Sequence, residues 1–368
     1  MIRRPPRSTR DSIRRQRQMC IRDSIFSDYA YFSSYSDSWL AHCRDYATKM
    51  RSRLELDASH QVVEIASNDG YLLQYFAGAG IPVLGVEPAA NVAAVAIDKG
   101  VPTVIEFFGV ECAKRLVGNG QQADLLLGNN VLAHVPDIND FVAGMAVALK
   151  PAGVVTMEFP HLLQLMRHNQ FDTIYHEHFS YLSLLAVEKI FAAHGLQVFD
   201  VDELPTHGGS LRIYARHSAG QDVADSVALL RNTEAQFGLG ELETYGRFGA
   251  QAQRTKDAVI DFLESAKAEG KRVLAYGAPA KGNTLLNYCG VGTDLIEFTV
   301  DRSPVKQGRF LPGSRIPVRA PEALLDAQPD YVLILPWNIR DEIMDKMSAV
   351  RDWGGKFVVP IPAVEVLE

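Results

Sequence analysis

Short apolar segments that alternate with helical stretches constrain the fold of this chain more than any other feature of its sequence. The first five apolar segments are 61–66, 82–87, 101–106, 123–129 and 154–159. Helical patterns lie between them, from Tyr71 onward and at 91–97 and 141–149. Strands that alternate with helices form a mostly parallel sheet with helices on both faces. The sequence therefore predicts an α/β fold.

A second αβ pattern follows the first and indicates a second domain, as expected for a chain of 368 residues. Its apolar segments are 272–277, 296–301, 331–336 and 356–361. The stretch before it is rich in Ala, Leu, Glu, Gln and Arg, which predicts connecting helices. We expect four parts, which are a helical lead-in at 25–58, a first α/β domain at 59–218, a helical connector at 219–270 and a smaller α/β domain at 271–368.

The first 24 residues differ in composition from the rest. They hold eight Arg and two Asp, and they have neither an apolar helical stripe nor the apolar core of a signal peptide. We interpret this segment as translated sequencing-adapter sequence that forms a disordered tail, and we expect the natural start to be missing. Without it the net charge changes from −7 to −13. So acidic a protein is a poor candidate for binding nucleic acid.

Cysteine spacing and hydropathy exclude further classes of protein. The four cysteines are scattered and form no C-x-x-C pair, which argues against a disulfide framework and against a metal site held by this chain alone. No apolar run is long enough to span a bilayer. We therefore expect a cytoplasmic protein that binds neither membranes nor nucleic acid.

Polar residues follow three of the predicted strands. The first strand runs into the turn 67–70, whose small residues let the chain pass close to a ligand. Glu87 ends the second strand, where a carboxylate can accept hydrogen bonds from both hydroxyls of a ribose. Asn129 and Asn130 end the fourth. Because open α/β sheets bind ligands at the carboxyl ends of their strands, these positions predict a nucleoside-type ligand.

The composition of the first turn favours S-adenosylmethionine (SAM) over a dinucleotide. A dinucleotide fold needs G-x-G-x-x-G, whereas this turn has Ala66, Asn68 and Gly70. Asp69 would repel a pyrophosphate and suits a cationic sulfonium or amino group. Taken alone, Glu87 could equally be a plain surface residue, so the prediction of a SAM-dependent methyltransferase depends on the three strand ends together.

A histidine-rich run follows the fifth predicted strand. Within seven residues it holds Tyr175, His176, Glu177, His178 and Tyr181. His176 and His178 are two residues apart and share a face if the run is extended. Metal binding is the weaker interpretation, because no third ligand has a suitable spacing and H-E-x-x-H is absent. The run indicates a pocket in which an imidazole removes a proton next to a carbonyl, while a phenol or second imidazole stabilises the enolate oxygen.

Other polar positions lie outside this run. His134 and His207 are candidates to line the same cavity, and a structural role is an equal interpretation for each. The G-A-P-A-K-G-N-T turn of the second domain places Lys281, Asn283 and Thr284 between a strand and a helix. A lysine and small residues at a helix N-terminus make an anion site, so this turn predicts diphosphate binding, although it does not match a P-loop.

Six motifs together resemble one known family. They are VEIASNDGYLLQYF, GVEPAANVA, NNVLAHVPDINDF, FDTIYHEHFSYLS, LPTHGGSLR and YGAPAKGNTLLNYCG. This set is similar to the SAM-dependent C-methyltransferases of nucleotide-linked deoxy-keto-sugars, and it covers the chain from Ile25 to its end. The resemblance implies a SAM-dependent methyltransferase Rossmann-like domain joined to a smaller Rossmann-like domain. It also implies C-methylation of a 4-keto-sugar through an enolate.

The resemblance also implies roles for individual residues. Those implied to line the SAM site are Glu64, Ser67, Asn68, Gly70, Glu87 and Asn130. Those implied to surround the reacting sugar are Tyr175, Glu177 and His178, with His178 as the base and His176 in the same run. The nucleotide-diphosphate site is implied to contain Lys281, Asn283 and Thr284, while His134 and His207 are substrate candidates from their positions in the sequence.

The sequence departs from the family at its start. The family usually begins with a small cysteine-rich zinc module, and this chain lacks those cysteines, so zinc is expected only in the missing module. We expect a nucleotide-linked keto-sugar as substrate and a monomer or homodimer. Two alternatives stay open: an O- or N-methyltransferase for another small molecule, and a truncated protein that binds nucleotide sugars without catalysis.

Overall fold

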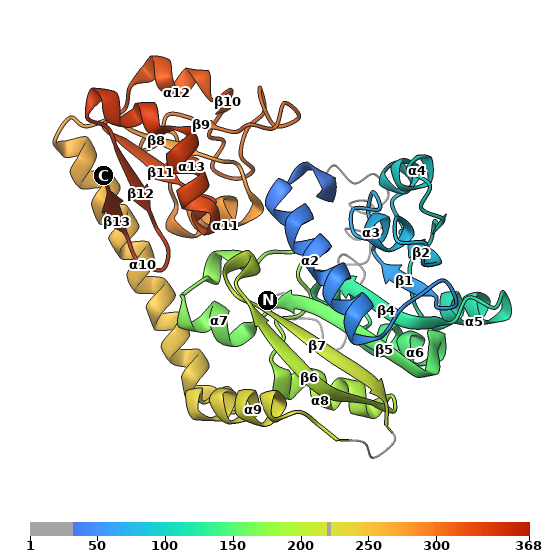
Figure 1. The fold of residues 1–368 in the computed structure, drawn as a ribbon. Helices are drawn as coiled ribbons and strands as arrows, with labels where there is room; N and C mark the ends of the chain where they lie inside the picture. The colour runs from blue at the N-terminus through green and yellow to red at the C-terminus, as the bar shows by residue number, and fades with distance from the viewer. Residues whose placement is uncertain (1–31, 219–221) are drawn as a thin grey trace, which may run out of the picture. The chain divides into compact units, whose positions relative to one another are not determined.

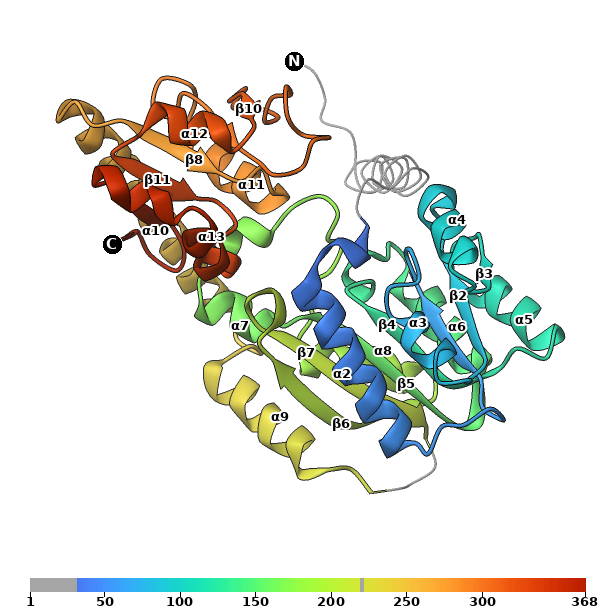
Figure 2. The same cartoon turned by 45° about the horizontal axis from the view of Figure 1, so that its top comes forward.

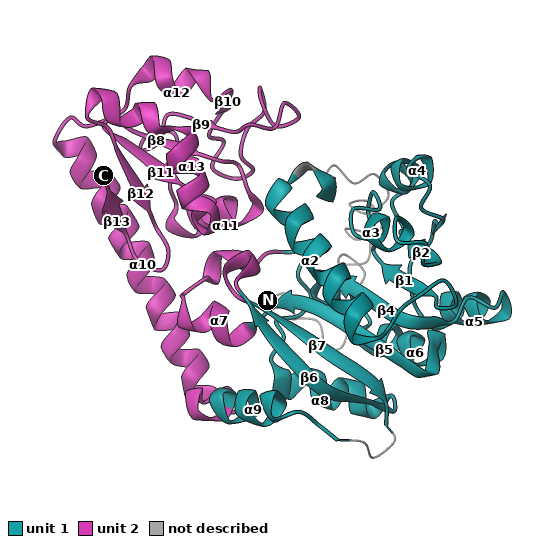
Figure 3. Ribbon diagram, viewed as in Figure 1, with its two compact units in different colours: residues 1–161, 176–204, 210–234 teal, residues 162–175, 205–209, 235–368 magenta. Residues whose placement is uncertain are grey.

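The computed structural model describes residues 32–218 and 222–368, so the interpretation of the first 24 residues lies outside the described part. The chain divides into two compact units, each with its own sheet (Figures 1 and 3). The first unit contains the chain up to His161, His176–Leu204 and Ser210–Glu234. The second unit contains Leu162–Tyr175, Pro205–Gly209 and Ala235–Glu368.

The sheet of the first unit has seven strands in the order β3-β2-β1-β4-β5-β7-β6. They are β1 (Val62–Ile65), β2 (Val83–Val86), β3 (Thr103–Val104), β4 (Ala123–Asn129), β5 (Leu149–Pro160), β6 (Leu196–Leu204) and β7 (Ser210–His217). β7 is antiparallel to both of its neighbours, and the other pairs are parallel. Each of the five apolar segments predicted as a strand forms one, which confirms the α/β prediction. The chain changes direction across the sheet between β1 and β4, and this switch point is where such sheets bind ligands.

Helices cover both faces of this sheet (Figure 2). One face packs against α5 (Val110–Gly118), α6 (Ile138–Ala148) and α8 (Leu184–Ala193). The other face packs against α2 (Asp37–Arg53), α3 (Leu73–Ala77) and α4 (Ala90–Asp98). Neighbouring residues of β1 bury on opposite faces, as Val62 and Val63 do, because side chains alternate along a strand. α9 (Asp225–Phe237) follows β7 and adds Val227 and Leu230 to the first of these two cores.

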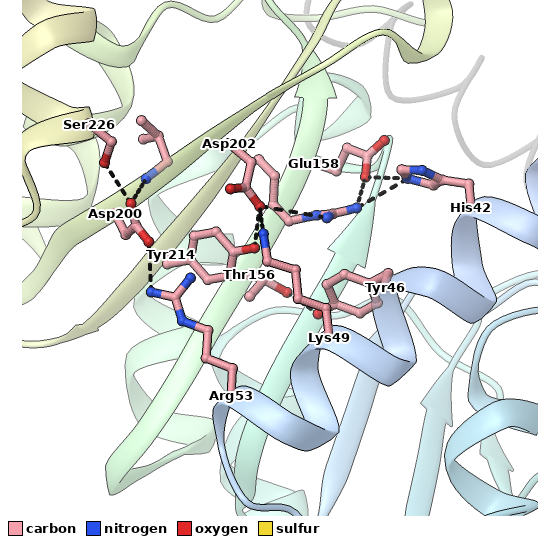
Figure 4. Close-up of polar contacts among 12 residues, drawn as sticks. His42, Tyr46, Lys49, Arg53, Thr156, Glu158, Asp200, Asp202, Tyr214 and Ser226 are labelled. Atoms are coloured by element: carbon pink, nitrogen blue, oxygen red, sulfur yellow. Dashed lines mark hydrogen bonds and ion pairs between the residues drawn. The ribbon is translucent and has the colours of Figure 1, made fainter.

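A polar network joins α2 to the strands β5, β6 and β7 (Figure 4). Glu158 is fully buried and receives hydrogen bonds from His42 Nε2 at 2.9 Å and Arg212 Nη2 at 2.5 Å. Lys49 and Asp202 form a further pair at 2.5 Å. A cavity of about 420 Å³ lies beside these pairs, lined by His42, Asp45, Tyr46, Lys49, Val201, Asp202, Glu203, Leu204 and Arg212. Charged pairs therefore fix this helix in addition to its apolar face.

The sheet of the second unit has six strands in the order β10-β9-β8-β11-β12-β13. They are β8 (Val273–Tyr276), β9 (Thr299–Val300), β10 (Val318–Arg319), β11 (Tyr331–Ile334), β12 (Lys356–Val359) and β13 (Glu365–Leu367). All are parallel except β13. The four strands predicted for this part are confirmed, whereas the two- and three-residue strands β10 and β13 were not predicted because they carry too few apolar residues to form a pattern.

The predicted connector forms two helices: most of α9 belongs to the first unit, and α10 (Leu242–Ala268) belongs to the second. α10 buries Val259, Leu263 and Ala266 in the core of this sheet. The remaining helices are α7 (Leu162–Arg167), α11 (Ala280–Cys289), α12 (Glu322–Ala327) and α13 (Arg340–Lys346). The short 3-10 helices of the two units are η1 (Ser33–Tyr35), η2 (Leu132–His134), η3 (Phe171–Thr173), η4 (Thr206–Gly208), η5 (Trp337–Ile339) and η6 (Ser348–Trp353). Across the described ranges, no helix combines the length and hydropathy needed to cross a membrane.

Candidate active site

The turn after β1 folds the chain tightly at the switch point of the first sheet. Ala66, Asn68 and Gly70 adopt positive φ angles of 58°, 49° and 76°. A Cβ atom on Gly70 would lie 3.1 Å from Cγ2 of Val101, and its positive φ would strain any larger residue. The positive φ therefore favours glycine at this predicted SAM-lining position.

Glu87 holds this turn against the end of β2. Its Oε2 accepts the backbone N–H of Asn68 at 2.9 Å, and its Oε1 accepts that of Ala89 at 2.9 Å. Glu87 is 4% exposed, and burial raises the pKa of its carboxyl. A carboxylate oxygen has two acceptor positions, so each oxygen retains one for a ligand hydroxyl.

Buried polar atoms around the switch point fit a polar ligand such as SAM. Ser67 Oγ, after β1, and Asn129 Nδ2, at the end of β4, are buried without a hydrogen-bond partner among residues 32–218 and 222–368. Buried polar groups in proteins nearly always have partners, so open ones here suit a bound molecule. Glu64 is fully buried in β1, and burial raises the pKa of its carboxyl well above its usual range.

Asp69 corrects one step of the sequence interpretation. Its carboxylate was expected to attract a cationic ligand, but it is 1% exposed and pairs with Lys99 Nζ at 3.2 Å and with the hydroxyl of Ser34. Its charge is therefore neutralised within the protein. The preference for SAM at this turn depends on the other polar groups.

The part of the histidine-rich run in the first unit is anchored to η2. His134 Nδ1 lies 2.9 Å from the carbonyl oxygen of Glu177, and the N–H of Phe179 donates to the carbonyl of Ala133 at 2.7 Å. The ring of His178 packs edge-on against that of His134, with centroids 4.8 Å apart. The tertiary structure thus brings together His134 and His178, which are 44 residues apart in sequence.

His134 is held as a neutral imidazole with a defined tautomer. Burial lowers its pKa to about 4, so it carries no charge near pH 7. Because a carbonyl oxygen only accepts hydrogen bonds, Nδ1 carries the proton and Nε2 carries the lone pair. A neutral neighbour does not oppose the positive charge that His178 would gain as a base. Glu177 is half-buried, and burial raises the pKa of its carboxyl.

The two histidines of the run do not share a face, contrary to the prediction. Residues 176 and 177 form a turn rather than extended backbone, so His176 is exposed while His178 packs on His134. Tyr175 and His207 belong to the second unit, where His207 is exposed and has a positive φ of 54°. No group of three potential metal ligands gathers anywhere in the described ranges.

The glycine–lysine turn of the second unit lies at the switch point between β8 and β11. The ammonium group of Lys281 lies over the ring of Trp337, 4.5 Å from its centre, and donates to Asn338 Oδ1. Trp337 Nε1 donates to Asp172 Oδ2 at 2.7 Å. Burial lowers the pKa of Lys281 to about 8, and Asp172 partly offsets this effect. Burial also raises the pKa of Asp172 to about 6.

Lys281 is predicted from the sequence, whereas the residues that hold it are not. Trp337 follows β11 and Asp172 lies in η3, and nothing in the local sequence of either indicates a partner at 281. The other two predicted residues are used differently. The hydroxyl of Thr284 donates to the carbonyl of Ala280 within α11, and the side chain of Asn283 accepts from Asn287.

Comparison with known proteins identifies the family. The chain is 39% identical to the C-methyltransferase NovU of Streptomyces niveus over 346 residues, which cover 94% of this chain and 82% of that protein. This chain belongs to the C-methyltransferase family. The similarity confirms the resemblance found in the sequence at the level of a SAM-dependent C-methyltransferase, with a methyltransferase domain followed by a second α/β domain.

Other known proteins and domain families are similar to parts of this chain. Residues 39–201 match a methyltransferase domain, and residues 205–362 match the C-methyltransferase C-terminal domain. A ubiquinone biosynthesis O-methyltransferase of Methylobacterium nodulans is 30% identical over 30% of the chain and 45% of its own length. The solved DhpI–SAH complex shares 21% identity over 55% of this chain and 97% of its own, with a TM-score of 0.39.

Proposed function

We propose that this C-methyltransferase methylates the carbon next to the ketone of a nucleotide-linked deoxy-keto-sugar. The observation that carries the proposal is the ordered pair of imidazoles, His134 and His178, near the switch point of a SAM-type sheet. C-methylation needs a base that removes a proton from carbon, whereas O-methylation needs only a base near a hydroxyl. SAM supplies the methyl group as an electrophile.

His178 acts in this proposal as the base. It takes the proton from the carbon beside the carbonyl, and the electrons of the broken C–H bond form an enolate. The enolate carbon then forms a bond to the methyl group while the S–CH₃ bond breaks, and the electron pair stays on sulfur. Tyr175 donates a hydrogen bond to the enolate oxygen, where negative charge develops.

The second unit binds the nucleotide part of the substrate in this proposal. Lys281 is a partly buried cation at the N-terminus of α11, where backbone N–H groups also favour an anion. Gly282 lets this helix start close to β11, because a Cβ atom there would lie 2.7 Å from Cβ of Leu335. A diphosphate supplies the anion that such a site selects.

The test combines the full chain with SAM and a panel of nucleotide-linked 4-keto-deoxysugars in deuterated water. Mass spectrometry follows methyl gain and hydrogen exchange at the carbon beside the ketone. We expect one methyl group at carbon and exchange that depends on His178. Methyl transfer to a hydroxyl or amine without exchange at carbon would contradict the proposal and favour an O- or N-methyltransferase. SAM binding without turnover across the panel would also contradict it.

A further inference from the structure

A buried hydrogen-bonded pair lies at the end of β5, outside the groups already described. His161 Nε2 and Glu234 Oε1 are 2.7 Å apart, and the two side chains are 0% and 2% exposed. The residues are 73 positions apart in sequence, His161 directly after β5 and Glu234 in α9. A carboxylate pays a large desolvation cost in such a place, so its retention calls for a physical reason.

Glu234 also holds the first turn of α8. Its Oε1 accepts the N–H of Leu184 at 2.6 Å, and its Oε2 accepts the N–H of Leu185 at 2.9 Å. These backbone donors have no partner within the helix, because they lie in its first turn. Ser183 adds its hydroxyl as the N-cap, accepting from Ala186 at 3.2 Å. The start of α8 is thereby fixed to α9.

His161 extends this anchor to the histidine-rich run. It forms a parallel β-bridge with Leu182, the residue immediately before the cap of α8. The other end of the run is anchored at Glu177 and Phe179 by the η2 contacts described above. His178 therefore lies in a segment of a few residues that is held at both ends.

We propose that Glu234, acting through His161 and the first turn of α8, is a positioning residue for His178. This inference rests on the proposed role of His178 as the base. A catalytic imidazole must be held within a fraction of an ångström of its working position, and buried hydrogen-bond networks provide that rigidity. Glu234 is 2% exposed, so we expect its effect to be on the rate of chemistry rather than on binding of SAM.

The variants Glu234→Ala and Glu234→Gln test the inference. The alanine variant loses all three hydrogen bonds, whereas glutamine retains an acceptor oxygen for His161 and Leu184. We expect kcat to fall about 100-fold in Glu234→Ala, the loss associated with a misplacement of about 1 Å. We expect Glu234→Gln to recover part of that loss and the Kd for SAM to stay within about twofold of wild type in both variants.

A matched control uses an ion pair between α8 and α9. Glu188 on α8 pairs with Arg231 on α9 through Nε at 2.8 Å, and this pair is partly exposed. We expect Glu188→Gln to keep wild-type kcat. Amide hydrogen exchange at Phe179 and Ser180 should rise in Glu234→Ala and stay unchanged in the control. A rise confined to this segment distinguishes positioning from a global loss of stability.

The outcomes separate this inference from the proposed function. If His178→Ala keeps normal turnover, the proposed base is wrong. If His178→Ala is inactive while Glu234→Ala and Glu234→Gln retain wild-type kcat, only the role of Glu234 is overturned. An equal loss of kcat and SAM affinity would also overturn it, because that pattern indicates general destabilisation. Should Glu234→Ala not fold, Glu234→Gln decides the matter by the same measurements.

Discussion

The first five strands of the two sheets follow the same order. In the first unit this order is β3-β2-β1-β4-β5, and in the second it is β10-β9-β8-β11-β12. In each, a carboxylate at the end of the second strand holds the turn after the first. Glu87 accepts from the N–H of Asn68 at 2.9 Å, and Asp301 accepts from that of Ala278 at 2.7 Å.

The residues at the two switch points differ in charge although the topology is shared. The first has buried carboxylates and amides, and its cation, Lys99, is already paired with Asp69. The second has Lys281 as a partly buried cation beside Trp337 and Asn338. The comparison teaches that sheet topology fixes where a ligand binds and that a few turn residues decide the charge it must have. We propose that the first set binds SAM and the second an anion.

The largest expected effect is on the rate of the reaction, with the affinities for both ligands unchanged. His178→Ala should lower kcat about 10³-fold, because general-base catalysis contributes rate factors of about 10² to 10⁴. Affinity for SAM and for a nucleoside diphosphate should stay within about twofold of wild type. Single-turnover methyl transfer and isothermal titration calorimetry measure the two quantities. Near-normal turnover would remove His178 from the reaction.

Glu87→Ala should act on the first switch point alone. Removing the carboxylate loses two backbone hydrogen bonds and the ribose acceptors, so the Kd for SAM should rise about 10- to 100-fold. Affinity for a nucleoside diphosphate should not change. Titration calorimetry with each ligand tests this separation. A parallel loss of both affinities would show that the two sites are not independent.

Lys281→Met should act on the second switch point alone, with a smaller effect. The Kd for uridine or thymidine diphosphate should rise about tenfold, because one charge-assisted contact is lost. The pH dependence has a defined sign. Since burial lowers the pKa of Lys281 to about 8, the lysine is charged below that pH, and affinity should fall as pH rises from 7 to 9.5. Asp172, Trp337 and Asn338 face the ammonium group, and Asp172 already titrates near pH 6. A pH dependence that persists in Lys281→Met would assign it to another group.

The smallest expected effect is on the pH dependence of stability, through the neutral imidazole of His134. The folded pKa of His134, about 4, lies below the usual value for histidine, so the unfolded chain takes up a proton first as pH falls. The free energy of unfolding should therefore decrease between about pH 6.5 and pH 4. For this partly exposed group we expect about 1–2 kcal/mol after allowing for solvent screening. Denaturant titrations of wild type and His134→Gln measure it, and identical pH slopes would contradict the assignment.

The sequence by itself determined the layered α/β architecture of this protein and the turns after β1 and β8. The apolar segments that became β1, β2, β4 and β5 were recognisable because burial on both faces of a parallel sheet demands local runs of apolar residues. The turn at 67–70 was recognisable because its small residues let the chain pass close to a ligand. The histidine-rich run and Lys281 were found from residue type and position alone.

Only the tertiary structure decided which side chains act together. Asp69 pairs with Lys99, His134 packs on His178, and Trp337 holds Lys281. Glu234 reaches His161 across 73 residues, and Asp172 reaches Trp337 across 165. Such pairs leave no periodic signal, because hydrogen bonds and ion pairs depend on distances of a few ångströms that strand order and helix packing create. Local sequence thus determines the helices and strands, and their packing determines which groups each ionisable side chain contacts.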